Sequence, residues 1–175
     1  MKSFEDAIDF VLRWEGGYVN DPNDHGGETY RGISRKSHPD WAGWPVVDAH
    51  VLSHGDIISA LEPHVWKFYR ENYWDKIKGD QLPSRVAIAV MDWAVHSSVE
   101  RASRALQNIV GASPDGIIGP ITVKSVYDYM DKGLSFEIVE ERREFLARLV
   151  SKRPSDRKFS EGWDNRLDSL SSVIA

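Results

Sequence analysis

Residues 14–34 read WEGGYVNDPNDHGGETYRGIS and place one carboxylate, Glu15, between a helix and a glycine-rich segment. Upstream, apolar residues recur at helical spacing, namely Phe4, Ala7, Ile8, Val11 and Leu12. Glu15 follows Val11 by four residues and Leu12 by three, so it continues the apolar face of that helix. A carboxylate on the buried side of a helix costs free energy unless it is satisfied or used. This position makes Glu15 the first candidate for chemistry.

The expected surroundings of Glu15 favour a protonated carboxyl group. Gly16 and Gly17 are expected to end the helix, which puts Glu15 in its last turn. The helix dipole is negative there, and partial burial acts in the same direction. A protonated carboxyl is the state that a general acid needs. The alternative is that Glu15 bonds a backbone amide or an arginine and only holds the loop.

Composition limits the function classes. The chain has 175 residues, of which 41% are hydrophobic and 28% charged, as in an ordinary globular chain of one domain or one domain with a small appendage. Its net charge of −5 argues against binding to nucleic acid. No apolar run approaches the roughly 20 residues of a membrane span, so no membrane insertion is expected. Without cysteine, disulfides and thiolate metal sites are excluded.

The pattern of apolar residues and turn formers predicts a mainly α fold with a small β-hairpin lobe. Residues 18–34 are expected to form a small hairpin or an irregular lobe, and residues 35–52 a loop. Pro63 and Pro120 suit the first turn of a helix, and residues 134–152 suit the last long one. The other expected helices are one capped by Ser3 that includes Glu15 in its last turn, and those at 53–61, 85–95 and 99–110, and residues 159–170 close the chain.

The segment Arg85–Val95 has almost no polar face, so it is expected to be buried nearly all round. Asp92 lies inside this segment and must find a partner. A structural Asp bonded to an arginine or a backbone amide is the main interpretation. The other is that Asp92 holds a cleft residue or contacts a substrate.

These motifs resemble the glycoside hydrolase family 108 N-acetylmuramidases, which are lysozyme-like, mostly helical enzymes of phages and bacteria. The resemblance rests on Glu15-Gly16-Gly17-Tyr18, Asn20-Asp21-Pro22, Gly26-Gly27-Glu28-Thr29 and Gly32-Ile33-Ser34. The second half resembles the peptidoglycan-binding domain usually joined to these enzymes. The matching residues there include Asp92, Leu106-Gln107, Asp115-Gly116, Gly119-Pro120, Gly162-Trp163 and Arg166.

The resemblance implies a two-part organisation and an activity. Residues 1–80 would form a lysozyme-like catalytic lobe, and residues 81–175 a helical peptidoglycan-binding lobe packed with it into one unit. The implied reaction is hydrolysis of the β-1,4 bond between N-acetylmuramic acid and N-acetylglucosamine, without a cofactor, with Glu15 as the catalytic acid. The chain departs from the family where an Asn-Ser-Gly turn is usual, because it has His96-Ser97-Ser98. If that turn lines the saccharide cleft, His96 is a candidate contact to substrate.

Glycoside hydrolysis commonly uses a second carboxyl group, which activates water or attacks the sugar. Asp24 is the preferred candidate, and Asp21 competes with it, although Asp21-Pro22 resembles a turn device. In the remaining alternative both are structural, and Thr29 or Tyr30 helps to position the water.

Aromatic side chains suit the C–H faces of sugars, but large aromatics also dominate protein cores. The possible cleft residues are Tyr18, Tyr30, Trp41, Trp44 and Trp74. The residues expected in the core are Trp14, Trp66, Trp93 and Trp163.

Two rival functions remain open at this point. One is a wall-binding or secretion-accessory module without turnover. The other is a peptidase or amidase, which would need a metal or a nucleophile; the spacing of His50, His54 and His64 fits a metal site poorly, and no Gly-x-Ser-x-Gly occurs. The amino-terminal segment has no apolar h-region. We therefore expect a monomer made in the cytoplasm that reaches the wall through a holin-like pore or a specialised exporter.

Overall fold

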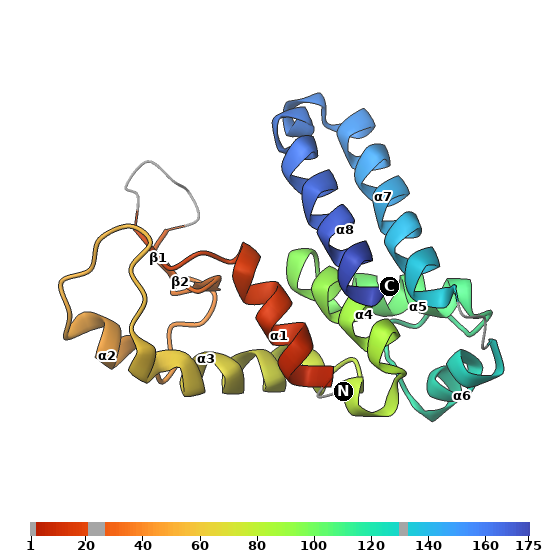
Figure 1. Cartoon of the computed structure of the whole chain (residues 1–175), viewed down its shortest axis with the longest axis horizontal. Coiled ribbons are helices and arrows are strands. Elements are labelled where there is room, and N and C mark those ends of the chain that lie inside the picture. Colours follow the sequence, from red (N-terminus) through yellow and green to blue (C-terminus); the bar gives the residue numbers. More distant parts are fainter. Residues whose placement is uncertain (1–2, 21–26, 130–132) are drawn as a thin grey trace. The chain divides into compact units, whose positions relative to one another are not determined.

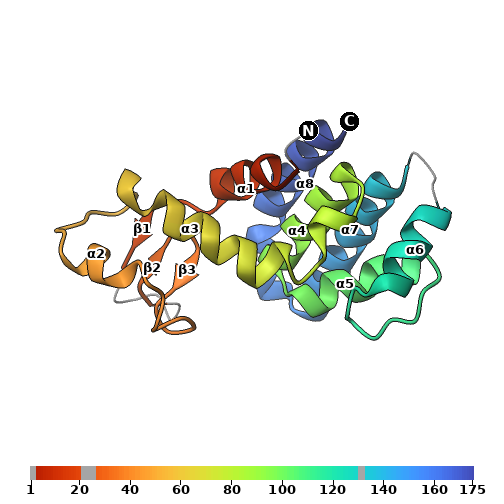
Figure 2. The same cartoon turned by 90° about the horizontal axis from the view of Figure 1, so that it is seen from below.

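The structure is a computed structural model that describes residues 3–20, 27–129 and 133–175. It confirms a mainly helical fold with a small antiparallel sheet (Figures 1 and 2). The α-helices are α1 (Ser3–Trp14), α2 (Trp44–Asp48), α3 (Glu62–Tyr69), α4 (Ser84–His96), α5 (Val99–Ile109), α6 (Pro120–Tyr129), α7 (Leu134–Lys152) and α8 (Ser160–Ile174). Shorter helical turns are η1 (Ser59–Leu61), η2 (Arg70–Trp74), η3 (Gly79–Gln81) and η4 (Pro154–Phe159).

The chain divides into two compact units. One is Ile8–Asn72, and the other combines Met1–Ala7 with Tyr73–Ala175. We call them the sheet unit and the helical unit. The division after Asn72 differs from the boundary between residues 80 and 81 that the sequence suggested, because the last two residues of η2 and all of η3 belong to the helical unit.

The sheet unit is built around three strands of two residues each, which lie beside α3 (Figures 1 and 2). They are β1 (Tyr18–Val19), β2 (Thr29–Tyr30) and β3 (Ile33–Ser34), in the order β1-β2-β3. Tyr30 is opposite both Tyr18 and Ile33 in the antiparallel register. The predicted hairpin lobe is thus a three-stranded sheet.

A two-residue turn joins β2 to β3, and both of its residues have positive φ. Arg31 has φ 50° and Gly32 has φ 77°. Two central residues of this kind make the turn whose twist matches that of a hairpin. A residue with a Cβ adopts this backbone reluctantly, so glycine is favoured at the second position.

The free edge of β1 pairs with the loop around Gly55. The Tyr18 amide donates to the Asp56 carbonyl at 2.9 Å, and the Gly55 amide donates to the Tyr18 carbonyl at 2.8 Å. The helix expected at residues 53–61 is therefore wrong except for η1, because the backbone groups of this loop are used by β1. Gly17 makes the approach possible, since a Cβ there would lie 2.2 Å from the Gly55 carbonyl oxygen.

In the helical unit, α4 lies among α5, α7 and α8. Residues Val86 to Ala94 of α4 are all buried, as the apolar run predicted. Long α7 and α8 run side by side (Figure 1), and α7 has the predicted bounds. Helix α4 is thus the centre of the core of this unit.

Candidate functional site

Glu15 directly follows the last residue of α1, one position beyond the predicted last turn. Its amide still donates to the Val11 carbonyl at 3.2 Å, so the backbone continues the helical pattern. The side chain is half-buried. A carboxyl group in this position is anchored through a helix and remains accessible to solvent.

The carboxyl of Glu15 lies against the turn between β2 and β3. A Cβ built on Gly32 would be 2.7 Å from Glu15 Oε2 and 2.6 Å from the Tyr69 hydroxyl oxygen. Both groups thus occupy the space that a side chain on Gly32 would fill. Tyr69 in α3 also donates its hydroxyl proton to the Arg31 carbonyl at 2.8 Å, which holds the turn against the helix.

Arg31 fastens the same turn to the end of α1. Its guanidinium donates to the Leu12 carbonyl at 3.3 Å and lies 3.4 Å from the Glu62 carboxylate in α3. The Leu12 carbonyl is in the last turn of α1, where a cation is favourable. Arg31, Gly32 and Tyr69 therefore fix the position of Glu15 relative to the sheet.

A second polar group lies at the other end of the strands. Glu28 accepts a hydrogen bond from the Tyr18 hydroxyl at 2.9 Å and pairs with Arg35. Arg35 also contacts Asp48 at 2.5 Å and lies 4.2 Å over the ring of Trp44. Burial, followed by the nearby Glu28, raises the pKa of Tyr18. Because Glu28 is held by two partners, it fits a scaffold role.

The structure brings two proposed contact residues into the core. Tyr30 has no exposed surface and Trp44 is 2% exposed. The Tyr30 hydroxyl accepts from the Ile58 amide at 2.7 Å, and the Trp44 indole donates to the His38 carbonyl at 2.7 Å. Both side chains are used in packing, so the expectation that they face a saccharide is corrected. Burial, as the main cause, also raises the pKa of Tyr30.

Of the other aromatic candidates, Trp74 is also fully buried. It packs edge-on against Phe4 at 5.5 Å and donates to Asp80 at 2.9 Å. Tyr18 is half-buried in β1 and Thr29 is half-buried in β2, so both remain candidates. Trp14, which was expected in the core, is 38% exposed.

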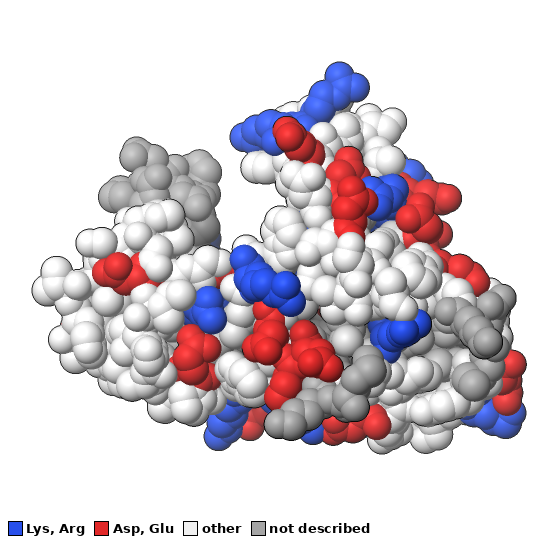
Figure 3. Space-filling view, in the orientation of Figure 1, with Lys and Arg blue, Asp and Glu red and all other residues white. Residues whose placement is uncertain are grey.

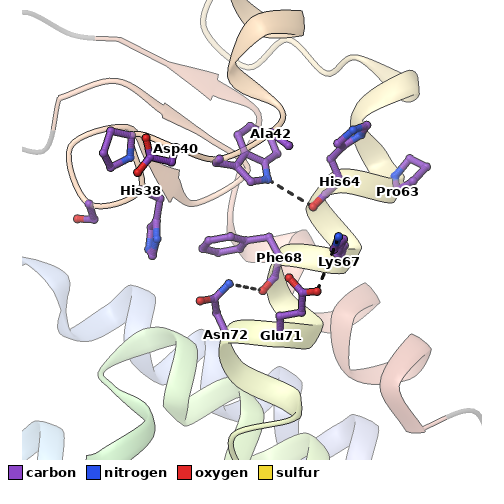
Figure 4. Close-up of a pocket in the computed structure, with 12 residues that line it drawn as sticks. His38, Asp40, Ala42, Pro63, His64, Lys67, Phe68, Glu71 and Asn72 are labelled. Atoms are coloured by element: carbon purple, nitrogen blue, oxygen red, sulfur yellow. Dashed lines mark hydrogen bonds and ion pairs between the residues drawn. The ribbon is translucent and has the colours of Figure 1, made fainter.

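An open cavity of about 670 Å³ lies between α3 and the loop before α2 (Figure 4). Its lining includes His38, Asp40 and Trp41 on the loop and His64, Lys67 and Glu71 on the helical side. Trp41 stacks on Tyr30 at 5.9 Å and is half-buried. Glu15 does not line this cavity, so we place the candidate chemistry at the Gly32 turn and not here.

Asp92 has no exposed surface and binds two arginines within the helical unit. It accepts from Arg142 at 2.5 Å and from Arg166 at 2.7 Å. Burial alone would raise the pKa of Asp92, but these two positive charges lower it below its ordinary value. The main interpretation from the sequence, a buried structural Asp, describes this arrangement, and the substrate-contact alternative does not.

His96 is the last residue of α4, and Ser98 caps α5 by accepting from the Arg101 amide at 3.2 Å. The His96 ring packs edge-on against Trp163 at 5.9 Å. Burial first, and then the charges of Arg142 and Arg166, lower the pKa of His96 to about 4. The imidazole is therefore neutral at neutral pH.

The favoured second carboxylate, Asp24, and its competitor Asp21 lie outside the described residues. Across the part of the chain that the structure describes, no group of three or more His, Cys, Asp or Glu side chains is placed to hold a metal ion. In the same part, no helix combines the length and the apolar character needed to cross a membrane.

Comparison with known proteins identifies both halves of the chain. Residues 8–97 match the family described as Glycosyl hydrolase 108. The chain belongs to glycosyl hydrolase family 108. Residues 101–168 match a second family, described as Predicted Peptidoglycan domain. No curated protein matches the chain.

Among solved structures, the glycosyl hydrolase 108 chain is similar to that of the structure titled "Structure of Brucella abortus SagA". The two sequences are 32% identical, the match covers 98% of this chain and 92% of the other, and the TM-score is 0.73. The family resemblance predicted from the sequence is thereby confirmed.

The two family matches divide the chain between Ser97 and Arg101, whereas the compact units divide it after Asn72. Helix α4 therefore belongs to the glycosyl hydrolase match by sequence and to the helical unit by packing.

Sequence reasoning did not identify the residues that hold Glu15. Gly32 was part of the quoted motif. A glycine directly before the apolar residue Ile33 was the available signal for a close approach at this position. Nothing in the spacing of Arg31 and Tyr69 connects them with Glu15, because Tyr69 lies in another helix and reaches the site only through the fold.

Proposed function

We propose that this protein is a peptidoglycan hydrolase that cleaves the β-1,4 bond between N-acetylmuramic acid and N-acetylglucosamine, with Glu15 as the general acid. Membership of glycosyl hydrolase family 108 supports the glycosidase activity, and the match to a peptidoglycan domain supports the substrate. The observation that carries the assignment is the half-buried Glu15 carboxyl, which lies against the Gly32 turn beside the Tyr69 hydroxyl.

In this reaction Glu15 gives its proton to the oxygen of the leaving sugar as the glycosidic bond breaks. The hydrogen bonds that Arg31 and Tyr69 make at the turn support this role, since catalysis needs the proton donor held within a fraction of an ångström. Arg31 and Tyr69 act as positioning residues, because they hold the turn on which the carboxyl lies. A second group then activates or replaces the attacking water.

Two candidates for the second group remain as proposals. Asp24 would serve as the carboxylate, and Thr29 in β2 would help to hold the water. In an enzyme with two carboxyl groups, a separation of about 5 Å gives retention and one of roughly 6.5–9.5 Å gives inversion. Determining the anomeric configuration of the first product would therefore report the distance between the two groups.

We also propose that the protein acts as a monomer on glycan strands of the cell wall. Access would be through a holin-like pore or a specialised exporter. The purified protein, added directly to isolated sacculi, should therefore digest them without a pore or an exporter.

The test is digestion of purified peptidoglycan with the wild type and with Glu15→Gln, followed by mass spectrometry of the products. We expect reducing-end muramic acid from the wild type and a loss of roughly a thousandfold or more for the variant, since the amide carries no transferable proton. Asp6→Asn is the matched control, because Asp6 is an exposed carboxylate on the same helix.

Retained lysis by Glu15→Gln would refute the role of Glu15. Intact glycan with both proteins, combined with co-sedimentation of protein and sacculi, would identify a binding module. Cleavage in the peptide stem with loss on chelation would identify a peptidase or amidase.

A further inference from the structure

A cavity of about 300 Å³ lies wholly within the helical unit, at the end of α4. Six of its lining residues are His96, Ser97, Arg101, Phe145, Arg153 and Trp163. All but His96 and Ser97 fall within the part that matches the peptidoglycan domain. The volume is at the lower end for ligand pockets, so it suits a group the size of one amino acid.

Aromatic rings form one side of this cavity. They are the rings of Trp163 and Phe145, and the Trp163 ring meets His96 edge-on at 5.9 Å. Phe145 lies 6.1 Å from Trp93, which is buried. The wall is thus anchored in the core through Trp93, and the rings of Phe145 and Trp163 are half-buried.

Two guanidinium groups line the cavity beside these rings. Arg101 lies 4.9 Å over the ring of Phe145, which is a favourable contact between a cation and an aromatic face. Arg153 follows α7 and is held by Asp156 at 3.0 Å. Both arginines are exposed. Each guanidinium has five N–H donors, so donors remain for a ligand beyond the contacts described.

The buried charges that act most strongly on His96 are also positive. The buried guanidiniums of Arg142 and Arg166 act on His96 more strongly than Asp92 does, and they help to keep the imidazole neutral. His96 Nδ1 is buried and has no hydrogen-bond partner among the described residues. Figure 3 shows Lys and Arg gathered at the end of the α7–α8 pair, where Lys152, Arg153, Arg157 and Lys158 are exposed.

The charged groups of the lining are all donors, and the side-chain acceptors among its described residues are the Ser97 hydroxyl and the His96 ring. No Asp, Glu, Asn or Gln is among the described residues that line the cavity. Sugar hydroxyls both donate and accept, whereas a carboxylate only accepts. The planar fork of an arginine matches a carboxylate with two parallel hydrogen bonds.

We propose that this cavity binds a free carboxylate of the peptide stem of peptidoglycan through Arg101 and Arg153. The aromatic wall would contact the apolar part of the same amino acid. The inference rests on the proposed function, because the wall polymer is taken as the ligand. It adds that the helical unit recognises the peptide as well as the sugar chain.

The experiment uses the full chain carrying Glu15→Gln, so that binding is measured without hydrolysis. Isothermal titration calorimetry would compare the free stem peptide with the same peptide after amidation of its carboxylates. We expect amidation to weaken binding at least about tenfold, and Arg101→Gln with Arg153→Gln to weaken binding of the free peptide by a similar factor.

Arg85→Gln with Arg157→Gln is the matched control, because it removes two exposed positive charges from the same unit but none from the cavity. We expect it to change the affinity less than about twofold. Equal binding of the free and amidated peptides would overturn the proposal, as would equal losses in the two double variants. Binding only to glycan strands stripped of peptide would identify a sugar subsite instead.

Failure of the carboxylate site and failure of the proposed enzyme activity give different results. A chain that binds the stem peptide but does not cleave sacculi even with Glu15 intact would refute the enzyme and retain the site. Cleavage of sacculi by a chain that shows no preference for the free peptide would do the reverse.

Discussion

Substituting Gly32 by alanine tests whether the turn between β2 and β3 positions Glu15. A Cβ there would lie 2.7 Å from Glu15 Oε2 and 2.6 Å from the Tyr69 hydroxyl oxygen. To reach an ordinary contact of 3.4 Å, the two oxygens must move by about 0.7 Å and 0.8 Å. A misplacement of about 1 Å can cost a factor of roughly one hundred in rate. We therefore expect Gly32→Ala to lower the rate of sacculus digestion by roughly 10- to 100-fold.

Backbone strain must be separated from this displacement. Gly32 has φ 77°, and a left-handed backbone costs a residue with a Cβ about 1–2 kcal/mol. Gly111→Ala is the matched control, because Gly111 has φ 70° and nothing within 4 Å of its Cβ position. It also lies in the other compact unit. Both variants should lose similar backbone stability, but only Gly32→Ala should lose activity.

The assay is the initial rate of dye release from labelled sacculi, measured well below the unfolding midpoint that tryptophan fluorescence in urea defines. Wild-type activity in a folded Gly32→Ala protein would refute the idea that this turn places the carboxyl. An equal loss of activity in Gly111→Ala would show that the rate follows stability alone.

Two further predictions concern the buried charges of the helical unit. Asp92→Asn should lower the free energy of unfolding in urea by about 3–5 kcal/mol, because it leaves the guanidiniums of Arg142 and Arg166 without their buried carboxylate. The control, Asp164→Asn, removes an exposed partner of Arg143 and should lower it by less than about 1 kcal/mol. His96 has a folded pKa of about 4 against an ordinary 6.5, so the unfolded chain binds more protons between these values. Stability should therefore fall by up to about 3 kcal/mol as the pH drops from 6.5 to 4, and His96→Gln should remove that part of the slope.

Elements with strong local signals were predicted from the sequence. The long helix over residues 134–152 has the expected bounds, and α3 begins beside Pro63 as expected. Residues 85–95 were expected to be buried nearly all round, and α4 is. In each case the apolar period or a proline determines the element within its own segment.

Elements whose backbone partners are distant in sequence were not predicted. Residues 53–61 suggested a helix, but Gly55 bonds Tyr18 and its φ is 88°. The short helix α2 was expected to be loop, although Pro45 at its first turn was a signal for it. The pairing with β1 depends on the close approach to Gly17, which no local pattern shows.

The site could be predicted only in part for the same reason. Glu15 was found because a carboxylate on the apolar face of a helix can be recognised from the local spacing of residues. The burial of Trp44 and Trp74 depends on Arg35, Phe4 and Asp80, which reach those rings through the fold. An aromatic side chain looks the same in a sequence whether it contacts sugar or core.

Helix α4 has a consequence for how such chains are recombined. A cut between Ser97 and Arg101 respects the two family matches but separates α4 from α5, α7 and α8, against which its apolar surface packs. Chimaeras that exchange the carboxyl-terminal part between homologues should therefore fail when joined there, and should fold when joined near Asn72 with Met1–Ala7 taken from the same homologue as Tyr73–Ala175. In this architecture the segment that must be exchanged to keep the helical core intact is longer than residues 101–168, which the peptidoglycan-domain match covers.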